Sequence, residues 1–448
     1  MVAIGICIVA FLVSFLATRY ALWAGVAAVF GWGYLYGIIR ANVGSPVAQF
    51  VFDVAFAGLF LAAVTRPVNA IQRYRLRGLM PWVVCLIGWP TALLLVPSQH
   101  VLIQLVGWRG NVLFVPFILY GAMLSGRDLP MLAKSLAILN ILVFIVAIAE
   151  TILGVPVFYP FNAVDAIIYK STDVIFDGEN HYRIPGTFTH AAAYATCMVA
   201  SMPLLLGALS LERAHSWGRY LLFAACGASA IGVFLAASRS EAAVLILMVA
   251  IMTASGRIGH LSWKGWVALV FGISILVALT PRMQRFFTLT QKGVITDRIH
   301  MSVNESIFDL IEEYPLGNGL GGGGTSVPYF LQDLVRDPVA MENEYARIVA
   351  EQGIPGLLVW VGFIIWLLTR RPPRKTDPWF MGKWLARLFC VISFATAPLG
   401  TGLLNAIPQT GMLLLFAGWI AAPEIDERIA AGAESSRRQP KLPVASTA

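Results

Sequence analysis

The chain has 448 residues, of which 58% are hydrophobic and only 12% charged, with a formal net charge of +8. Soluble globular proteins carry about 25% charged residues, so this composition excludes a cytosolic enzyme, a disordered scaffold and a small secreted disulfide protein. The apolar residues form long blocks, each close to the ~20 residues that cross ~30 Å of hydrocarbon. We therefore expect an all-α polytopic membrane protein.

The apolar blocks predict about 12–13 transmembrane helices, with a long external loop before a late helix. The first block lacks a basic segment before it, so we expect no cleavable signal peptide. In chain order, the predicted spans are 2–17, 21–39, 47–64, 80–97, 101–124, 131–150, 190–210, 220–236, 241–255, 265–280, 343–369, 382–398 and 404–421.

The basic residues of short loops predict the orientation, because cytoplasmic loops carry an excess of Lys and Arg. The loops at 65–79 and 370–383 are the richest in them. With these loops in the cytoplasm, the weaker basic loops fall on the same side. The two long polar connections, 151–189 and 281–342, then lie outside, which is the periplasm if the cell is Gram-negative.

The chain divides into four parts on this basis. Residues 1–280 form transmembrane helices with the external loop at 151–189. Residues 281–342 form a large periplasmic loop with short helices, and 343–421 form the C-terminal transmembrane helices. Residues 422–448 are rich in Pro, Ser, Ala and Arg, which predicts a disordered cytoplasmic tail.

Neither the charge nor the cysteines indicate a nucleic-acid or metal site. The basic residues lie mostly in short loops rather than on a soluble surface, so we expect no nucleic-acid partner. All five cysteines lie within apolar stretches, which argues against a disulfide framework and a zinc site. The acidic triplet at 177–179 is too common a pattern to indicate a metal, so we expect no metal and no cofactor.

The predicted outer loops nevertheless carry several cations, which suggests an anionic ligand on that face. The alternative is that they bind lipid headgroups or neighbouring carboxylates such as Asp297 and Glu305. These cations are Lys170, Arg183, Arg282, Arg285, Lys292, Arg298 and Arg336.

The segment 183–190, RIPGTFTH, opens an apolar helix after the first long loop. Pro and Gly break the chain there, and Thr189 is a candidate N-cap. Arg183 is therefore expected just outside the membrane, beside a helix N-terminus whose dipole favours anions. Taken alone, such an arginine more often contacts lipid phosphates.

Three ionisable residues are expected at or within the membrane. Arg239 lies in a tight outward turn, where it either binds a phosphate or pairs with Glu241 or Glu150. Arg109 and Asp53 interrupt otherwise apolar spans. Such groups are costly in hydrocarbon and face a cavity or one another. They are either part of a functional site or a structural Asp–Arg pair.

The second long loop contains a glycine run at 321–324 that lacks the Gly-Lys-Ser/Thr of a P-loop. Gly319 and Gly321 are candidates for a flexible hinge or a close backbone approach to a ligand. Glu342 lies where the next helix enters the membrane, so it is either a general base with a raised pKa or an ordinary dipole partner. On the same helix, three residues share one face and are expected to neutralise each other: Glu344, Arg347 and Glu351.

Over roughly residues 100–370 the chain resembles the O-antigen ligase/polymerase superfamily, which includes Wzy-type polysaccharide polymerases and WaaL-type ligases. The resemblance rests on the order of four short motifs. These are Arg-x-Pro-Gly-Thr-Phe at 183–188, Ser-Arg-Ser at 238–240, Glu-x-Pro-Leu-Gly-x-Gly-Leu-Gly at 313–321, and Glu342-Asn343 followed by Glu-x-Gly-Ile-x-Gly at 351–356.

The resemblance implies a glycosyltransferase at the periplasmic face of a bacterial inner membrane. It would polymerise undecaprenyl-diphosphate-linked repeat units into O-antigen or exopolysaccharide by inverting, metal-independent transfer. Membrane lipid and a chain-length regulator are the further candidate partners. Glu342 would be the base, and a set of arginines would hold the diphosphate and stabilise its departure: Arg109, Arg183, Arg239, Arg285 and Arg298.

Three other functions stay open. Ligases typically show His-Asn where this chain has Glu342-Asn343, so transfer of the glycan to lipid A–core is the second choice. A transporter or lipid flippase would explain Arg109 and Asp53 without covalent chemistry, although the two halves show no repeat. A peptidoglycan polymerase would need an external catalytic aspartate, for which Asp297 and Asp309 are available.

Overall fold

The computed structural model describes residues 1–162, 164–170, 172–176, 179–213, 215–255, 307–324, 327–339 and 343–423. The predicted span 265–280 and the predicted site residues Arg285, Arg298 and Glu342 lie outside these residues. Nearly all of the predicted tail, 424–448, does so as well.

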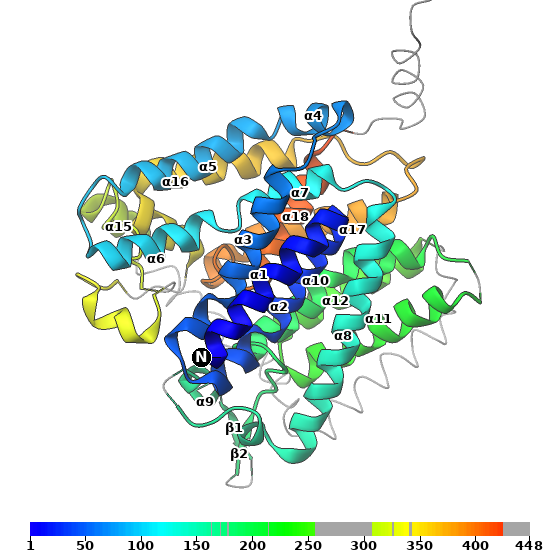
Figure 1. Cartoon of the computed structure of the whole chain (residues 1–448), viewed down its shortest axis with the longest axis horizontal. Coiled ribbons are helices and arrows are strands. Elements are labelled where there is room, and N and C mark those ends of the chain that lie inside the picture. Colours follow the sequence, from blue (N-terminus) through cyan, green and yellow to red (C-terminus); the bar gives the residue numbers. More distant parts are fainter. Residues whose placement is uncertain are drawn as a thin grey trace, which may run out of the picture.

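The described residues form an all-α bundle with a single two-stranded hairpin (Figure 1). The first half contains α1 (Val2–Tyr20), α2 (Leu22–Val43), η1 (Pro46–Phe50), α3 (Val51–Val64), α4 (Ala70–Arg77), α5 (Met80–Leu93), α6 (Val101–Val112), α7 (Pro116–Met123), α8 (Asp128–Leu153), η2 (Val155–Val157), α9 (Ala166–Lys170), β1 (Thr172–Phe176) and β2 (Glu179–Tyr182). The second half contains α10 (Ala191–Leu209), α11 (Trp217–Leu235), α12 (Arg239–Ala254), α15 (Ile307–Glu313), η4 (Tyr329–Leu334), α16 (Glu344–Leu368), α17 (Phe380–Thr396), η5 (Ala397–Leu399) and α18 (Gln409–Ala421).

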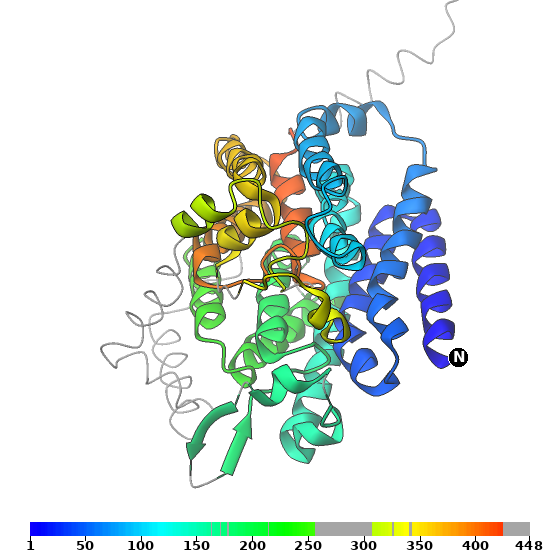
Figure 2. The same ribbon diagram turned by 90° about the vertical axis from the view of Figure 1, so that its left-hand side faces the viewer.

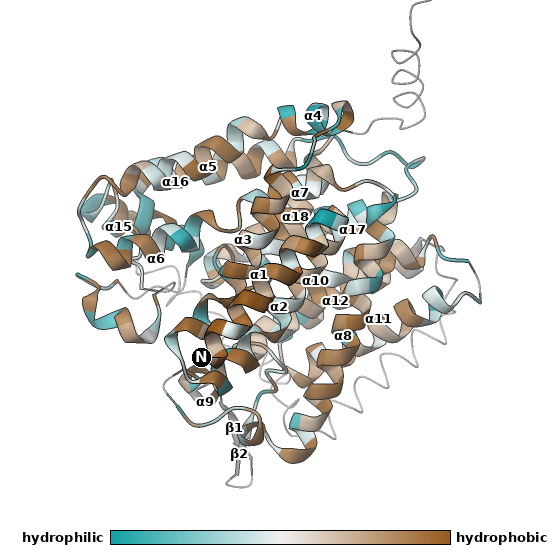
Figure 3. Cartoon of the chain, in the orientation of Figure 1, coloured by the Kyte–Doolittle hydropathy of each residue, from teal (hydrophilic) through white to brown (hydrophobic). Residues whose placement is uncertain are grey.

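Within the described part of the chain, nine helical stretches are long and apolar enough to cross a membrane. The count becomes ten if α4 and α5, bent by 61° relative to each other, form one broken span. A polytopic α-helical membrane protein is therefore confirmed. Helices α12 and α18 correspond to two further predicted spans and are shorter, with 16 and 13 residues. The long helices consist mostly of hydrophobic residues, while hydrophilic residues gather on α4 and the connecting loops (Figure 3).

The connections sort into two opposite ends of the bundle. Figures 1 and 2 both place α4 at one end and the β1–β2 hairpin at the other. At the α4 end, Gln72 and Arg75 donate hydrogen bonds to the carbonyl oxygens of Met123 and Leu124. The basic loop at 65–79 thus meets the connection between α7 and α8. We call this the basic end and the opposite one the outer end, following the orientation that the sequence predicts.

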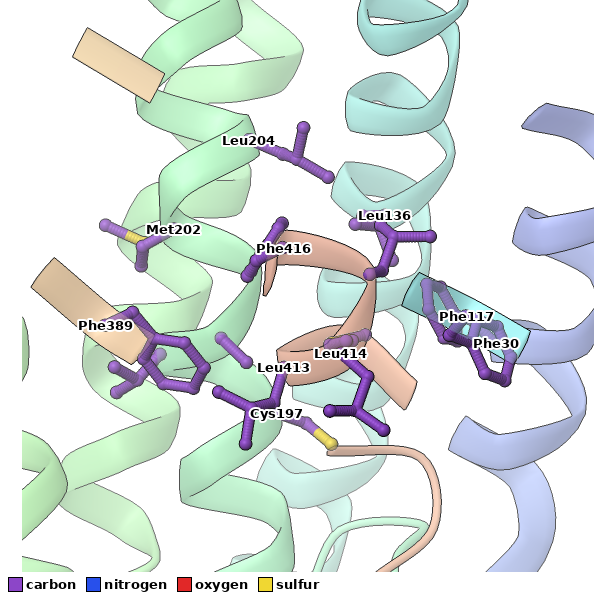
Figure 4. Packing of buried hydrophobic residues seen from close by; sticks show 14 of the residues in the cluster. Phe30, Phe117, Leu136, Cys197, Met202, Leu204, Phe389, Leu413, Leu414 and Phe416 are labelled. Atoms are coloured by element: carbon purple, nitrogen blue, oxygen red, sulfur yellow. The ribbon is translucent and has the colours of Figure 1, made fainter. Parts of the chain in front are cut away.

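Helix α10 lies at the centre of the bundle, and nearly all of its side chains are buried. Glycines allow α7 and α18 to pack closely: a Cβ at Gly418 would lie 1.8 Å from the carbonyl oxygen of Ile118. The buried amide of Asn140 accepts a hydrogen bond from Tyr34 at 2.8 Å and donates to the hydroxyls of Ser201 and Ser229. It thereby fixes α2, α8, α10 and α11 relative to one another. Figure 4 shows the apolar packing around this centre, including Leu136, Cys197, Leu204, Leu414 and Phe416.

Candidate functional site

The RIPGTF segment lies inside the outer end of the bundle rather than on its surface. Ile184 and Phe188 are at most 1% exposed. The Tyr159 hydroxyl donates to the carbonyl oxygens of Gly186 and Phe188 at 2.7 and 2.9 Å. The amide of Gly186 donates to a carboxylate oxygen of Glu150 at 2.9 Å. Backbone polar groups at this depth must be satisfied by protein, and these contacts satisfy them.

Helix α2 comes close to this segment because Gly37 has no side chain. A Cβ at Gly37 would lie 2.1 Å from the carbonyl carbon of Phe188. One residue further on, the Ile38 amide donates to the carbonyl oxygen of Thr187 at 3.1 Å. The last turn of α2, which carries Arg40, therefore lies directly beside the RIPGTF segment.

Arg183 joins two of the sequence motifs. Its Nε donates a hydrogen bond to the carbonyl oxygen of Ala236 at 2.9 Å, in the turn that leads into Ser238 and Arg239. Ala237 in this turn has a φ of 48°, a left-handed conformation uncommon for a residue with a side chain. Two predicted diphosphate-binding arginines, Arg183 and Arg239, are thus brought to one place. Both also have further interactions.

Helix α10 begins one residue later than the sequence predicts. Its N-cap is His190 rather than Thr189, and the Thr189 hydroxyl lies 2.9 Å from His190 Nδ1. Burial, followed by the positive charges of Arg183 and Arg40, lowers the pKa of the His190 imidazole from 6.5 to about 4. Arg40, Arg183 and His190 therefore lie within electrostatic range of one another at the outer end.

Sequence reasoning missed Arg40. It follows directly after the predicted span 21–39 and leads into a short loop at the outer end. Arg239 stood out because it is an arginine on the outer side, where the orientation rule disfavours basic residues. Arg40 has the same feature. Its proximity to the RIPGTF segment depends on contacts across more than a hundred residues, which no local pattern indicates.

Arg109 pairs with Asp53, one of the two alternatives that the sequence left open. The Arg109 Nε contacts one carboxylate oxygen of Asp53, and the second guanidinium contact, to the other oxygen, is 2.7 Å. Such a bidentate arrangement is the strongest kind of guanidinium–carboxylate contact. The Arg109 guanidinium also lies 5.9 Å from the centre of the Phe50 ring. A diphosphate contact for Arg109 stays a prediction, and it would have to compete with Asp53.

The charged residues at the start of α16 neutralise each other, as the sequence predicts. Arg347 forms ion pairs with Glu344 at 2.7 Å and with Glu351 at 2.8 Å, and all three side chains are fully buried. Asn111 of α6 donates to Glu351 at 2.7 Å and accepts from Arg347 at 3.2 Å. Buried charges are tolerated when they are paired and hydrogen-bonded in this way.

Glu344 also ties α16 to the loop between α17 and α18. Its carboxylate accepts backbone N–H groups from Gly402, Leu403 and Leu404 at 2.7, 3.2 and 3.3 Å. Asn343 caps the helix by accepting the Tyr345 and Ala346 amides. The start of α16, which follows Glu342 directly in the chain, is therefore fixed by the contacts of two side chains, those of Asn343 and Glu344.

The glycine-rich loop packs between α6 and α16. Gly319 and Gly321 have φ values of 96° and 79°, which residues with side chains rarely adopt. A Cβ at Gly107 of α6 would lie 2.1 Å from the Gly321 amide nitrogen. The Asn318 amide donates to the carbonyl oxygen of Ala350 at 2.7 Å. These glycines allow close approach to protein backbone, and a hinge role for Gly319 and Gly321 stays a prediction.

Comparison with known families adds one finding to this geometry. Residues 224–361 match a family model described as O-antigen ligase. This match supports the resemblance to the O-antigen ligase/polymerase superfamily that the sequence motifs indicate. No curated protein matches the chain.

The matched stretch contains much of the O-antigen ligase/polymerase site suggested by the sequence. It includes Arg239, the glycine-rich loop and the buried cluster of Glu344, Arg347 and Glu351. Arg183 lies outside it but contacts it through the carbonyl oxygen of Ala236. Arg40 and Arg109 lie in the N-terminal part of the chain, before the matched stretch.

Proposed function

We propose that this member of the O-antigen ligase/polymerase superfamily is a polymerase of lipid-linked glycans. It transfers a growing glycan from undecaprenyl diphosphate to the next repeat unit at the periplasmic face of the bacterial inner membrane, with inversion at the anomeric carbon. The observation that carries this proposal is the contact of Arg183 with the turn that precedes Arg239. It supports a single cationic site built from two motifs distant in the sequence.

The chemistry of the transfer calls for such a site. Displacement of a lipid diphosphate from the anomeric carbon leaves negative charge on the departing oxygen, and preorganised cations stabilise it as it develops. Guanidinium groups suit phosphate because their N–H groups bind two oxygens at once. In the proposed mechanism, Arg183 and Arg239 have this role, with Arg298 and Arg285 as further contacts. Glu342 removes the proton from the incoming hydroxyl.

The buried charges at the start of α16 support Glu342 as the base, because they fix the residues next to it in the chain. A general base must lie within hydrogen-bond distance of the proton that it removes, so its backbone must be held firmly. Asn343 and Glu344 are the two residues that follow Glu342. Their side chains together accept five backbone amides, from the first turn of α16 and from the loop between α17 and α18. Glu342 acts chemically in this proposal, and Glu344 positions it.

Transfer to a lipid A–core acceptor is the second candidate. The Glu342-Asn343 pair favours polymerisation, since ligases of this superfamily typically show His-Asn. Comparison of lipid-linked glycans from cells with and without the gene distinguishes the two. Polymerase loss leaves single repeat units on the lipid, whereas ligase loss leaves intact polymer that is not transferred to its anchor. Normal glycans in the deletion strain would contradict both and favour transport of another molecule.

A further inference from the structure

We infer that Arg40 is a further anion-binding residue of the outer site and contacts a diphosphate ester together with Arg183 and His190. This inference rests on the proposed function and adds a residue that neither the sequence motifs nor the matched family segment contains. Arg40 lies in the last turn of α2, beside the RIPGTF segment and the loop that follows α8.

Three segments meet at Arg40. Ile38, two residues earlier, donates its amide to Thr187 of the RIPGTF segment. Asn42, two residues later, donates its side-chain amide to the carbonyl oxygen of Phe158 at 2.9 Å. Arg40 itself donates to the carbonyl oxygen of Val164 at 3.3 Å. The guanidinium is thus held at the junction of α2, the loop after α8 and the segment that carries Arg183.

Within the described part of the chain, only some of the N–H donors of Arg40 have a partner. A guanidinium has five N–H donors, and a buried one is normally paired with a carboxylate. Among the residues that the structure describes, Arg40 forms no ion pair within 4 Å, and its Nε is buried without a hydrogen-bond partner. Its guanidinium carbon lies 5.7 Å from the centre of the Tyr36 ring, and Tyr36 also accepts a hydrogen bond from Arg40. Arg109, by contrast, has a bidentate partner in Asp53.

A second charged group, Asp165, acts on Arg40 without pairing with it. Asp165 acts electrostatically on the same region, but neither of its buried carboxylate oxygens has a hydrogen-bond partner. Burial raises the pKa of Asp165 to about 6, while Arg40 and Asn162 lower it. Asp165 therefore remains largely ionised near neutral pH, and its charge acts on Arg40 without a hydrogen bond between the two groups. Two guanidinium groups at the outer end then offer positive charge to a doubly charged phosphate group, and the neutral His190 imidazole can share a hydrogen bond with it.

The test measures binding to the full-length chain purified in detergent, with farnesyl diphosphate and inorganic diphosphate as probes. Arg40→Gln should weaken the binding of both probes at least tenfold, and Asp165→Asn should strengthen it because a negative charge near the ligand is removed. Arg66→Gln is the matched control. Arg66 also donates to a carbonyl oxygen, that of Thr18 at 2.7 Å, but at the basic end, so its loss should change binding less than twofold.

The outcomes separate this inference from the proposed function. If Arg40→Gln binds as the wild type does while Arg183→Gln loses binding, Arg40 is not a ligand contact and the proposed function stands. If the wild type binds neither probe, both fail together. Phosphatidylglycerol that displaces farnesyl diphosphate at equal concentration would overturn the diphosphate assignment in favour of ordinary lipid phosphate. Should Arg40→Gln not fold, unchanged binding by Asp165→Asn would overturn the inference.

Discussion

The Nε of Arg183 donates a hydrogen bond to the carbonyl oxygen of Ala236 at 2.9 Å. This contact joins the segment after the first long loop to the start of α12, more than fifty residues further along the chain. It places Arg183 beside the turn that leads into a second arginine, Arg239. The same guanidinium acts electrostatically on His190, as does Arg40. The outer end of the bundle therefore gathers cations from three separate parts of the sequence.

Glu344→Gln should destabilise the fold. A glutamine loses one of the two buried ion pairs of Arg347, although Glu351 still pairs with it, and the NH₂ group would oppose the backbone amides of Gly402, Leu403 and Leu404. Removing one partner of a buried ion pair costs about 3–5 kcal/mol when the other charge is left unpaired, so the retained Glu351 makes this range the upper bound. The measurement is the thermal unfolding of the purified chain in detergent. Glu212→Gln is the control, because its ion pair with Lys134 is partly exposed and should be worth at most about 1 kcal/mol. If the two variants lost the same amount of thermal stability, the buried ion pairs described for α16 would be contradicted.

Glu342→Gln should instead abolish activity without lowering stability. The proposed base loses its proton-accepting form, which for general-base catalysis is worth about 10²–10⁴-fold in rate. The measurement is glycan transfer per folded molecule, compared with that of Glu344→Gln. If Glu342→Gln were as active as the wild type once corrected for folded protein, Glu342 would have no catalytic role.

Gly107→Ala should displace the glycine-rich loop. The added methyl would lie 2.1 Å from the Gly321 amide nitrogen, and backbone cannot move aside cheaply. Overpacking of this kind costs about 1–3 kcal/mol, and thermal unfolding measures it. Gly88→Ala on α5 is the matched control, since no atom lies within 4 Å of its added Cβ. The control should leave stability unchanged or slightly raised. Equal stability of the two variants would show that the loop does not pack as described.

His190 should contribute to stability in a pH-dependent way. Its pKa in the folded chain, about 4, is below its ordinary value of 6.5, so folding favours the neutral imidazole. Its contribution is complete above pH 6.5 and is lost as the pH falls through 4. The stability difference between the wild type and His190→Gln should therefore decrease as the pH falls from 6.5 to 4. A difference that stays constant over this range would contradict the burial of His190 between the two arginines.

Hydropathy alone predicted most of the helices, because a membrane requires long continuous apolar segments. The prediction was least complete for the helices that are bent or interrupted. The 61° bend between α4 and α5 and the non-helical Gly353 inside α16 do not interrupt the apolar pattern. Gly353 adopts a φ of 68°, and a Cβ there would lie 2.5 Å from the carbonyl carbon of Leu316 in the glycine-rich loop. That break depends on a long-range contact rather than on local sequence.

The sequence predicted contacts between residues of one helix. It did not predict contacts that depend on which helices pack together. Glu344, Arg347 and Glu351 share a helix face by their spacing, so their mutual neutralisation follows from helix geometry. The pairing of Arg109 with Asp53, and the use of Glu150 to hold the Gly186 amide, depend on which helices meet. Arg40 became a candidate only when α2 was found beside the RIPGTF segment.

The lipid-linked glycans of cells that carry Arg183→Ala or Arg239→Ala test the account most directly. Removal of either cation should leave the protein inserted in the membrane and lower polymer formation by about 10²-fold or more, the usual cost of losing a preorganised group that stabilises developing charge. Single repeat units should then accumulate on the lipid carrier. Full-length polymer at normal yield from either variant would contradict the diphosphate site at the outer end.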